Sequence, residues 1–220
     1  MLQIYDKLLE LPIFLGFSKK DIERIIDTTR LGFQTLDPSA TVVKRNEKCR
    51  ALFFLTDGTL SVESKADDNS YTIIEELSAP AVLQPEHLFG LTQHYSKTFI
   101  TQTRCNFIYI EKNEVFRLIE EHLIFRLNFF NTLSTVAQKA NRLIWKKEPS
   151  TIRHRFLYFL RQRCCSPVGK KTLKIKMQTL ADEIHESRLN VSKILHELET
   201  ERLILLSRSQ IIIEALEKLK

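Results

Sequence analysis

Long apolar runs are missing from this 220-residue chain. No stretch approaches the roughly 20 consecutive apolar residues that a bilayer-spanning helix needs, so we expect no membrane association. The first residues, MLQIYDKLLELPIF, contain acidic side chains and lack the basic n-region of a secretory signal peptide. Because 43% of the residues are hydrophobic, the chain can form packed cores and is not expected to be disordered. We therefore expect a cytoplasmic protein with one large or two small domains.

Signatures of catalysis are also missing. The sequence contains no Gly-rich phosphate loop, no nucleophile elbow and no His, Cys and Asp set with metal-ligand spacing. Its six histidines are scattered without a surrounding motif. We therefore expect neither an enzyme nor a bound metal or other cofactor. Haem sensing through one histidine is an alternative that no motif supports, and an absorbance spectrum of the purified protein would test it.

Cysteine is sparse and poorly spaced for metal binding. The four cysteines, Cys49, Cys105, Cys164 and Cys165, include no CxxC pair, and two adjacent cysteines cannot easily chelate one metal. We expect reduced, mostly buried thiols.

Net charge is unevenly distributed along the chain. Residues 1–148 contain 19 Lys and Arg against 19 Asp and Glu, whereas residues 149–220 contain 14 against 8. All six excess positive charges therefore lie in the last third of the chain. A basic module joined to a neutral one is typical of proteins that bind double-stranded DNA through one domain.

Residues 177–204, MQTLADEIHESRLNVSKILHELETERLI, have apolar positions at helical spacing with one interruption at residues 185–187. This pattern predicts a helix from about Gln178 to Ile184, a tight turn, and a second helix that Ser187 caps. The N-terminal end of the second helix is the part that meets base edges in a helix-turn-helix protein. The alternative is a pair of amphipathic helices in an ordinary bundle.

The segment TLADEIHESRLNVSKILHELETERLI resembles the DNA-binding motif of the Crp/Fnr family of bacterial transcription regulators. In that family a Ser-Arg pair opens the recognition helix and a basic or polar residue follows, as Ser187-Arg188 and Lys193 do here. Two positions differ, because Leu189 replaces the usual Glu and His185 replaces the turn Gly. The first difference argues against the family's best-known operator, and the second implies a slightly altered turn. The N-terminal cysteine group that holds an iron–sulfur cluster in some relatives is absent before Cys49.

The helix-turn-helix assignment predicts which residues contact DNA. We expect Arg188 to be the main base reader, since Arg pairs bidentately with guanine, and Asn190 and Lys193 to assist. Ser187 and Ser192 are expected to contact phosphate or cap the helix. The predicted phosphate contacts outside this helix are Arg208, Lys170 and Lys171.

Residues 31–110 change to short segments rich in β-branched and aromatic residues, and the Ser18–Asp21 capping box predicts a helix before them. The expected strands are residues 41–43, 51–55, 60–63, 71–74, 99–101 and 107–110. Many short strands without long helices between them predict a sandwich, barrel or roll. FFLTDGTLSV, with Gly58 at its turn, resembles a hairpin of cyclic nucleotide-binding domains. The resemblance implies an antiparallel, cupin-like β-roll.

The phosphate-binding segment of that domain type corresponds to AVLQPEHLFGLTQHYSKTF. Its Gly-Glu step becomes Gln84-Pro85 and its Arg becomes Tyr95. Because a cyclic phosphate needs a guanidinium fork and free backbone amides, these changes argue against cyclic AMP. The residues that could line a pocket for another, unknown effector are Gln84, Glu86, His87, Tyr95, Ser96 and Lys97. The alternative function is a sensor whose roll binds a cyclic nucleotide or another small metabolite.

From Asn113, a plausible N-cap, a helical pattern continues to about Lys147 without Gly or Pro. Two apolar stripes run along it, and one of them alternates at spacings of four and three residues. We expect the other stripe to cover the roll and this one to form a parallel homodimer. The alternative is a single helix buried within one chain. The expected dimer seam is Leu123, Leu127, Phe130, Ser134, Ala137, Asn141 and Ile144.

Pro149-Ser150-Thr151 marks a boundary, with a hinge at residues 146–149. An amphipathic helix at residues 152–163 and a β-hairpin with Arg208 at its tip complete a winged helix. The predicted α+β chain has a sensor domain (1–112), a dimerisation helix (113–148) and a DNA-binding domain (149–220). Its dimer would bind a pseudo-palindromic operator with half-sites about 34 Å apart. Activation would need contact with RNA polymerase, for which the sequence has no distinguishing signature.

Overall fold

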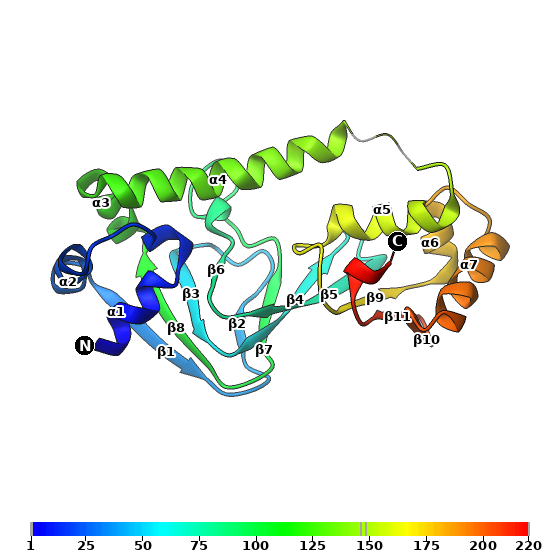
Figure 1. Cartoon of the computed structure of the whole chain (residues 1–220), viewed down its shortest axis with the longest axis horizontal. Helices are drawn as coiled ribbons and strands as arrows, with labels where there is room; N and C mark the ends of the chain where they lie inside the picture. Colours follow the sequence, from blue (N-terminus) through cyan, green and yellow to red (C-terminus); the bar gives the residue numbers. More distant parts are fainter. Residues whose placement is uncertain (1, 146, 148, 220) are drawn as a thin grey trace. The chain divides into compact units, whose positions relative to one another are not determined.

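The computed structural model describes residues 2–145, 147 and 149–219. The chain divides into two compact units. The N-terminal unit contains the residues up to Leu60 together with Leu77–Ile144, and the C-terminal unit contains Ser61–Glu76 together with Trp145–Lys220 (Figure 1). The chain therefore passes between the units in the middle of two strands as well as after Ile144. Among the described residues, no helix is long and apolar enough to cross a membrane.

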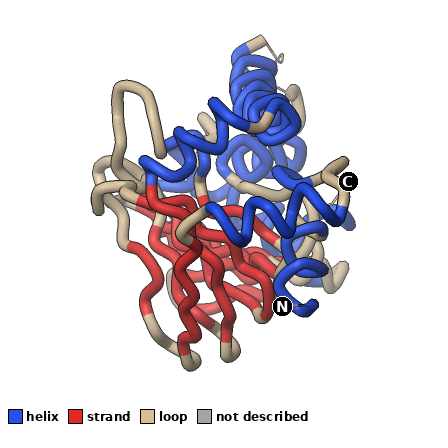
Figure 2. Tube along the Cα trace, turned by 90° about the vertical axis from the view of Figure 1, so that its left-hand side faces the viewer, coloured by secondary structure: helices blue, strands red, loops and turns tan. Residues whose placement is uncertain are grey.

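Antiparallel strands form the roll of the N-terminal unit, which Figure 2 shows with its strands in red and the helices in blue. One sheet has the order β1-β8-β3-β6, and β2 pairs with β7 opposite it. The strands are β1 (Leu31–Leu36), β2 (Thr41–Val43), β3 (Ala51–Asp57), β6 (Ala81–Leu83), β7 (Thr98–Thr101) and β8 (Cys105–Glu111). This arrangement confirms the predicted β-roll. The expected strand set lacks β1, which contains Gly32 and Gln34, and β6, which is only three residues long.

The N-terminal helices are α1 (Leu2–Leu9), the 3-10 helix η1 (Pro12–Phe14) and α2 (Lys19–Thr28). The predicted capping box is confirmed, since the Ser18 hydroxyl accepts from the Asp21 amide and the Asp21 carboxylate accepts from the Ser18 amide. Phe14 joins these helices to the roll and to the long helix. Its ring lies 5.7 Å from that of Phe54 and 5.5 Å from that of Phe125.

The predicted uninterrupted helix from Asn113 is wrong at one residue. The structure has α3 (Lys112–Glu121) and α4 (Leu123–Ile144), because His122 adopts an extended conformation with φ −120° and ψ 103°. Glu111, not Asn113, occupies the N-cap position. After the break, α4 packs on the N-terminal unit through the buried rings of Phe125 and Phe129. The predicted hinge falls partly on residues 146 and 148, which lie outside the described residues.

The C-terminal unit is a winged helix, as predicted. Its helices are α5 (Ile152–Arg163), α6 (Met177–Glu183), α7 (Arg188–Thr200) and the 3-10 helix η3 (Leu216–Lys218). Its strands are β9 (Lys171–Ile175), β10 (Ile204–Ser207) and β11 (Gln210–Ile213). The Thr151 hydroxyl caps α5 by accepting from the His154 amide. The apolar faces of α5, α6 and α7 meet in one core that includes Phe156, Leu195 and Leu198.

A hairpin from the middle of the chain extends this winged helix. The hairpin consists of β4 (Thr59–Lys65) and β5 (Tyr71–Ser78), and it gives the strand order β10-β11-β9-β5-β4. Strand β5 pairs antiparallel with β9, from Tyr71 opposite Ile175 to Glu75 opposite Lys171. Ile73 belongs to the core of the winged helix. The sequence predicts both strands but not their pairing.

Candidate nucleic-acid interface

The helix-turn-helix consists of α6, a four-residue connection (residues 184–187) and α7. Helix α6 is shifted by one residue from the predicted Gln178–Ile184, and α7 begins directly after Ser187, as predicted. The Ser187 hydroxyl accepts a hydrogen bond from the Asn190 amide at 3.2 Å, so the predicted N-cap is confirmed. His185 has φ 52°, in the left-handed region that favours glycine. His185 therefore adopts the left-handed conformation of the turn itself, although a glycine would adopt it more easily.

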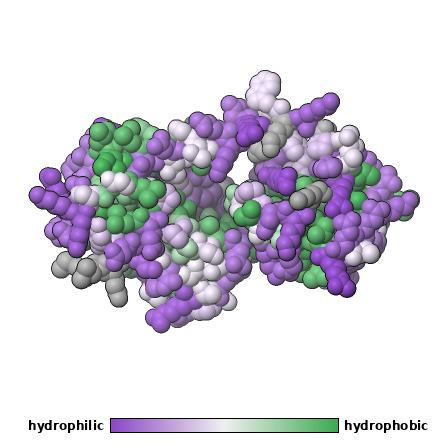
Figure 3. Space-filling view, viewed as in Figure 1, coloured by the Kyte–Doolittle hydropathy of each residue, from purple (hydrophilic) through white to green (hydrophobic). Residues whose placement is uncertain are grey.

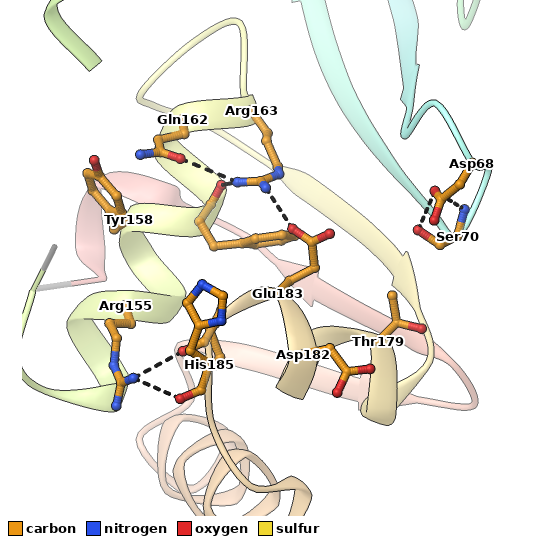
Figure 4. A pocket seen from close by; sticks show the side chains of 12 residues that line it. Asp68, Ser70, Arg155, Tyr158, Gln162, Arg163, Thr179, Asp182, Glu183 and His185 are labelled. Carbon is orange, nitrogen blue, oxygen red and sulfur yellow. Dashed lines mark hydrogen bonds and ion pairs between the residues drawn. The ribbon is translucent and has the colours of Figure 1, made fainter. Parts of the chain in front are cut away.

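Arg155 of α5 holds the turn in place. Its Nη1 atom donates to the carbonyl oxygens of Ile184 (3.2 Å) and His185 (3.0 Å), and its Nη2 atom forms an ion pair with Glu186. Figure 4 shows the Arg155 side chain reaching from its helix to the turn. This role of Arg155 is not predictable from the sequence, because nothing in its local motif distinguishes it from the other arginines of α5. It fixes the position from which α7 begins.

Glu186 links the turn to the recognition helix. The Asn190 side chain donates to its carboxylate at 3.1 Å, and the Ser187 amide donates at 3.2 Å. The Asn190 amide, the Ser187 backbone amide and the Arg155 guanidinium together hold the pKa of Glu186 below its ordinary value. Glu186 is therefore an anion at neutral pH, and one N–H group of Asn190 is directed to it. Asn190 has less hydrogen-bonding capacity left for a base than its position in the sequence suggests.

One face of α7 is exposed, and its opposite face is buried. Val191, Leu195 and Leu198 have no exposed surface and pack in the core of the unit. The structure places four predicted residues differently with respect to solvent: Arg188 and Lys193 are exposed, and Asn190 and Ser192 are partly buried. Leu189 is 66% exposed, which is unusual for a leucine in a helix with a complete apolar face. The exposed N-terminal end of α7 therefore presents two cations around one apolar side chain.

The three predicted phosphate contacts outside α7 have different surroundings. Arg208 is exposed at the turn between β10 and β11. Lys170 is half exposed and lies 3.1 Å from the carboxylate of Glu214. Lys171 is 1% exposed, and its ammonium pairs with the Glu75 carboxylate at 3.0 Å and donates to the Val168 carbonyl at 2.8 Å. A buried and paired ammonium cannot reach a DNA phosphate. The prediction that Lys171 contacts phosphate is therefore wrong.

A cavity of about 720 Å³ lies between α5, α6 and the hairpin tip, all within the C-terminal unit (Figure 4). Two of its charged side chains, Arg163 and Glu183, pair at 2.6 Å, and the Asp68 carboxylate accepts from the amide and hydroxyl of Ser70. Arg163 also donates to the Tyr71 hydroxyl. The cavity lies beside the turn of the helix-turn-helix, and residues of both the turn and the β4–β5 hairpin line it.

In the predicted effector segment, the side chain of Gln84 forms hydrogen bonds with Ser96 and Lys97. It has φ 39°, a conformation that favours glycine, and it precedes the 3-10 helix η2 (Pro85–His87). Its side-chain oxygen accepts from the backbone amides of Ser96 (3.1 Å) and Lys97 (3.2 Å), and its nitrogen donates to the Ser96 hydroxyl (2.6 Å). The buried Gln84 residue therefore engages two backbone amides of this segment.

Tyr95 stands where the related domains have a phosphate-binding arginine, by the alignment above. It is 2% exposed, and its hydroxyl donates to the Ala51 carbonyl oxygen at 3.1 Å. Burial raises the pKa of Tyr95, and burial likewise raises the pKa of the neighbouring Cys49 thiol. Both groups are uncharged at neutral pH. Tyr95 lines a cavity of about 510 Å³ whose other walls include Lys48, Arg50 and Tyr109. Of the other predicted pocket residues, Glu86 and His87 are partly buried.

The cysteines are all free thiols. Cys49 and Cys105 are buried, Cys164 is partly buried and Cys165 is exposed. Within the described part of the chain, no three His, Cys, Asp or Glu side chains are grouped so that they could hold a metal ion.

Two family models match the sequence, in the order of the domains just described. The model of the cyclic nucleotide-binding domain matches residues 33–122, and that of the Crp-like helix-turn-helix domain matches residues 154–220. No curated protein matches the chain in a sequence comparison.

Solved structures with the same fold include three regulators. The catabolite activator protein of Thermus thermophilus is 16% identical over 94% of this chain and 96% of that one, with a TM-score of 0.55. A Crp/Fnr family regulator from Eubacterium rectale is 18% identical over 94% and 95%, with a TM-score of 0.51. The sensor domain of the regulator DNR from Pseudomonas aeruginosa is 14% identical over 68% and 97%, with a TM-score of 0.53. These likenesses show a shared fold. With a cyclic nucleotide-binding domain followed by a Crp-like helix-turn-helix domain, the chain belongs to the Crp/Fnr type of DNA-binding transcription regulator.

Proposed function

We propose that this protein is a homodimeric transcription regulator that binds a pseudo-palindromic operator through α7 without responding to cyclic AMP. The observation that carries the proposal is the exposed, basic N-terminal end of α7 on a turn that Arg155 and Glu186 hold in place. A recognition helix inserts this end into the major groove. A fixed turn aids such insertion, because less conformational entropy is lost when the complex forms.

Arg188 is the principal base reader in this proposal. It is exposed at the first position of α7, and a guanidinium can bond bidentately to O6 and N7 of guanine. Lys193 lies further along the exposed face, and Ser192 is partly exposed beside it. Arg208 at the wing and Lys170 are assigned to phosphates, where they position the protein without reading sequence. Asn190 takes a secondary role, since Glu186 already engages its amide.

Helix α4 is the proposed dimer interface. Leu123, Leu127 and Phe130 are 58%, 52% and 50% exposed in the single chain, whereas Phe125 and Phe129 on the other stripe are buried. A space-filling view shows hydrophobic surface over α3 and the start of α4 (Figure 3). Exposed apolar side chains in one stripe are stabilised when a second copy of the chain covers them. We therefore expect a homodimer that pairs along this stripe and presents two copies of α7.

Cyclic AMP is not the expected effector. Gln84 engages the amides of Ser96 and Lys97, and the uncharged Tyr95 replaces the arginine that would pair with a phosphate. A cyclic nucleotide would have to displace these bonds, and residue 95 offers its phosphate no guanidinium. The second candidate function is control by another small molecule, which the 510 Å³ cavity beside Tyr95 favours. Calorimetry with nucleotides and short metabolites would test this alternative.

The test of the proposed function is selection of genomic DNA fragments by the purified full-length protein, at low and at high salt. A two-fold-symmetric motif is expected without added ligand. Replacing Arg188 by Ala should weaken operator binding by about 1–3 kcal/mol and relax the sequence preference at one position of each half-site. The control is Arg24→Ala, which removes an exposed cation from α2 in the other unit.

The variants separate a base reader from general electrostatic attraction. Arg24→Ala should leave the motif unchanged. It should lower the affinity only slightly, because the charge that it removes is far from the DNA and is screened by salt. An Arg188→Ala protein that kept both affinity and selectivity would refute the assignment. Salt-sensitive binding without any enriched motif would instead favour the second candidate, in which an effector must first align the two recognition helices.

A further inference from the structure

Leu189 is an apolar side chain on the surface expected to meet DNA. It occupies the second position of α7 and is 66% exposed. It is not needed for the core, because Val191, Leu195 and Leu198 complete the buried face of the helix. A solvent-exposed leucine between Arg188 and the exposed Lys193 therefore has no structural reason within the unit.

The chemistry of the major groove limits what this leucine can recognise. Base edges in the groove offer hydrogen-bond donors and acceptors, to which a leucine contributes nothing. The one apolar group among the four bases there is the C5-methyl of thymine. A glutamate at the same position would accept a hydrogen bond from the N4 amino group of cytosine. Replacing a carboxylate by an isobutyl group thus removes the preference for a cytosine donor and favours a methyl group.

We propose that Leu189 is a specificity-determining residue that contacts the C5-methyl group of a thymine in each half-site of the operator. The inference rests on the proposed function and names one position of its recognition code. Arg188 and Leu189 are adjacent in the first turn of α7, about 100° apart around the helix axis. A helix entering the groove at this end would bring both to neighbouring base pairs, so the methyl lies next to the base that Arg188 reads.

The experiment uses the full-length protein and the operator recovered by selection. Each thymine of one half-site is replaced in turn by uracil, which removes only the C5-methyl group. For the wild type, one replacement should weaken binding by about threefold to tenfold, the value expected for losing one buried methyl contact. Restoring the methyl at that base pair, by returning thymine, recovers the affinity.

Two variants show whether Leu189 makes the contact. Leu189→Ala should bind the thymine and uracil operators equally, because its methyl-sized side chain no longer reaches the base. Its fold should be unchanged, as circular dichroism would verify, since the side chain is exposed. Leu205→Ala is the matched control: Leu205 of β10 is 54% exposed in the same unit, and its removal should leave the thymine-to-uracil difference intact.

The outcomes separate this inference from the proposed function. If the wild type recovers a symmetric motif but no uracil replacement weakens binding, or if Leu189→Ala keeps the same uracil sensitivity, the Leu189 assignment is overturned while the regulator stands. If no symmetric motif is recovered under any condition, both fail together. Uracil sensitivity at one position that Leu189→Ala abolishes and Leu205→Ala preserves establishes the contact.

Discussion

Lys171 and Glu75 form an ion pair that is almost completely enclosed. Their side chains are 1% and 2% exposed, and the nitrogen–oxygen distance is 3.0 Å. The Glu75 carboxylate also accepts from the amides of Cys165 (2.7 Å) and Ser166 (3.2 Å). Since a desolvated charge is costly unless paired and hydrogen-bonded, each partner depends on the other. The pair therefore fixes β5 against β9 at one register.

Removing one member of this pair should be strongly destabilising. Lys171→Met leaves the Glu75 carboxylate buried without a counter-charge and is expected to lower the free energy of unfolding by about 3–5 kcal/mol. Adding Glu75→Gln should recover much of the loss, because a neutral amide still accepts a backbone hydrogen bond. The measurement is chemical denaturation of the full-length protein, followed by circular dichroism.

The neighbouring lysine provides the control for the buried pair. Lys170 lies next in the sequence and pairs with Glu214, but both side chains are about half exposed. Lys170→Met should therefore change the unfolding free energy by only about 0–1 kcal/mol. Equal effects of the two lysine substitutions would mean that burial of the Glu75 pair is not what stabilises the unit.

Residue-level predictions succeed where the deciding partner is close in sequence. The N-cap role of Ser187 depends on an amide three residues later, so the local motif is sufficient. The surroundings of Lys171 depend on Glu75, which lies in a strand from a distant part of the chain. From the sequence, Lys170 and Lys171 are two equivalent cations, whereas the structure places one in solvent and the other in the interior.

At the scale of elements, α4 has two different apolar stripes. Phe125 and Phe129 are buried against their own unit, with rings near Phe14 and Phe89 respectively. The other stripe contains Leu127, which is half exposed. The first half of α4 therefore has one stripe covered and one uncovered, and it is suited to pair with a second copy through the uncovered stripe.

A charge in the uncovered stripe should disrupt the dimer. Leu127→Glu places two carboxylates in the proposed interface and is expected to weaken dimerisation by on the order of 100-fold or more. Lys139→Glu is the control, because Lys139 is exposed and lies about 120° from Leu127 around the axis of α4, outside the proposed seam. Sedimentation velocity measures both. A Leu127→Glu protein as dimeric as the wild type would exclude this seam.

Elements were predictable where periodicity and capping agree. The helix-turn-helix and the wing follow from local signals: an N-cap serine, apolar positions at helical spacing, and a short turn between β-branched segments. The break at His122 carries no Gly or Pro, so no local signal in the sequence marks it. Strand pairing of β5 with β9 is equally invisible, because an alternating pattern predicts a strand without naming its neighbour.

At the scale of the whole molecule, sequence order and compact units do not coincide. Residues 1–148 are electrically neutral and residues 149–220 carry all the excess positive charge. The compact C-terminal unit nevertheless includes Ser61–Glu76 from the neutral part. A cut after Ile144 would therefore separate the basic winged helix from a hairpin that belongs to its sheet.

A fragment of residues 145–220 should consequently be an incomplete domain. It lacks β5, so β9 becomes an open edge strand and the Lys171 ammonium loses the Glu75 carboxylate. We expect weak protection of the β9 amides in hydrogen exchange, and stronger protection when a peptide of residues 59–78 is added. The same peptide with Glu75→Lys should not protect them, since two ammonium groups would meet in a buried position. If the β9 amides are as well protected in the fragment alone as in the full-length protein, the hairpin is not needed to stabilise the winged helix. If protection requires the peptide and its glutamate, the C-terminal unit is completed by a strand from the first half of the chain.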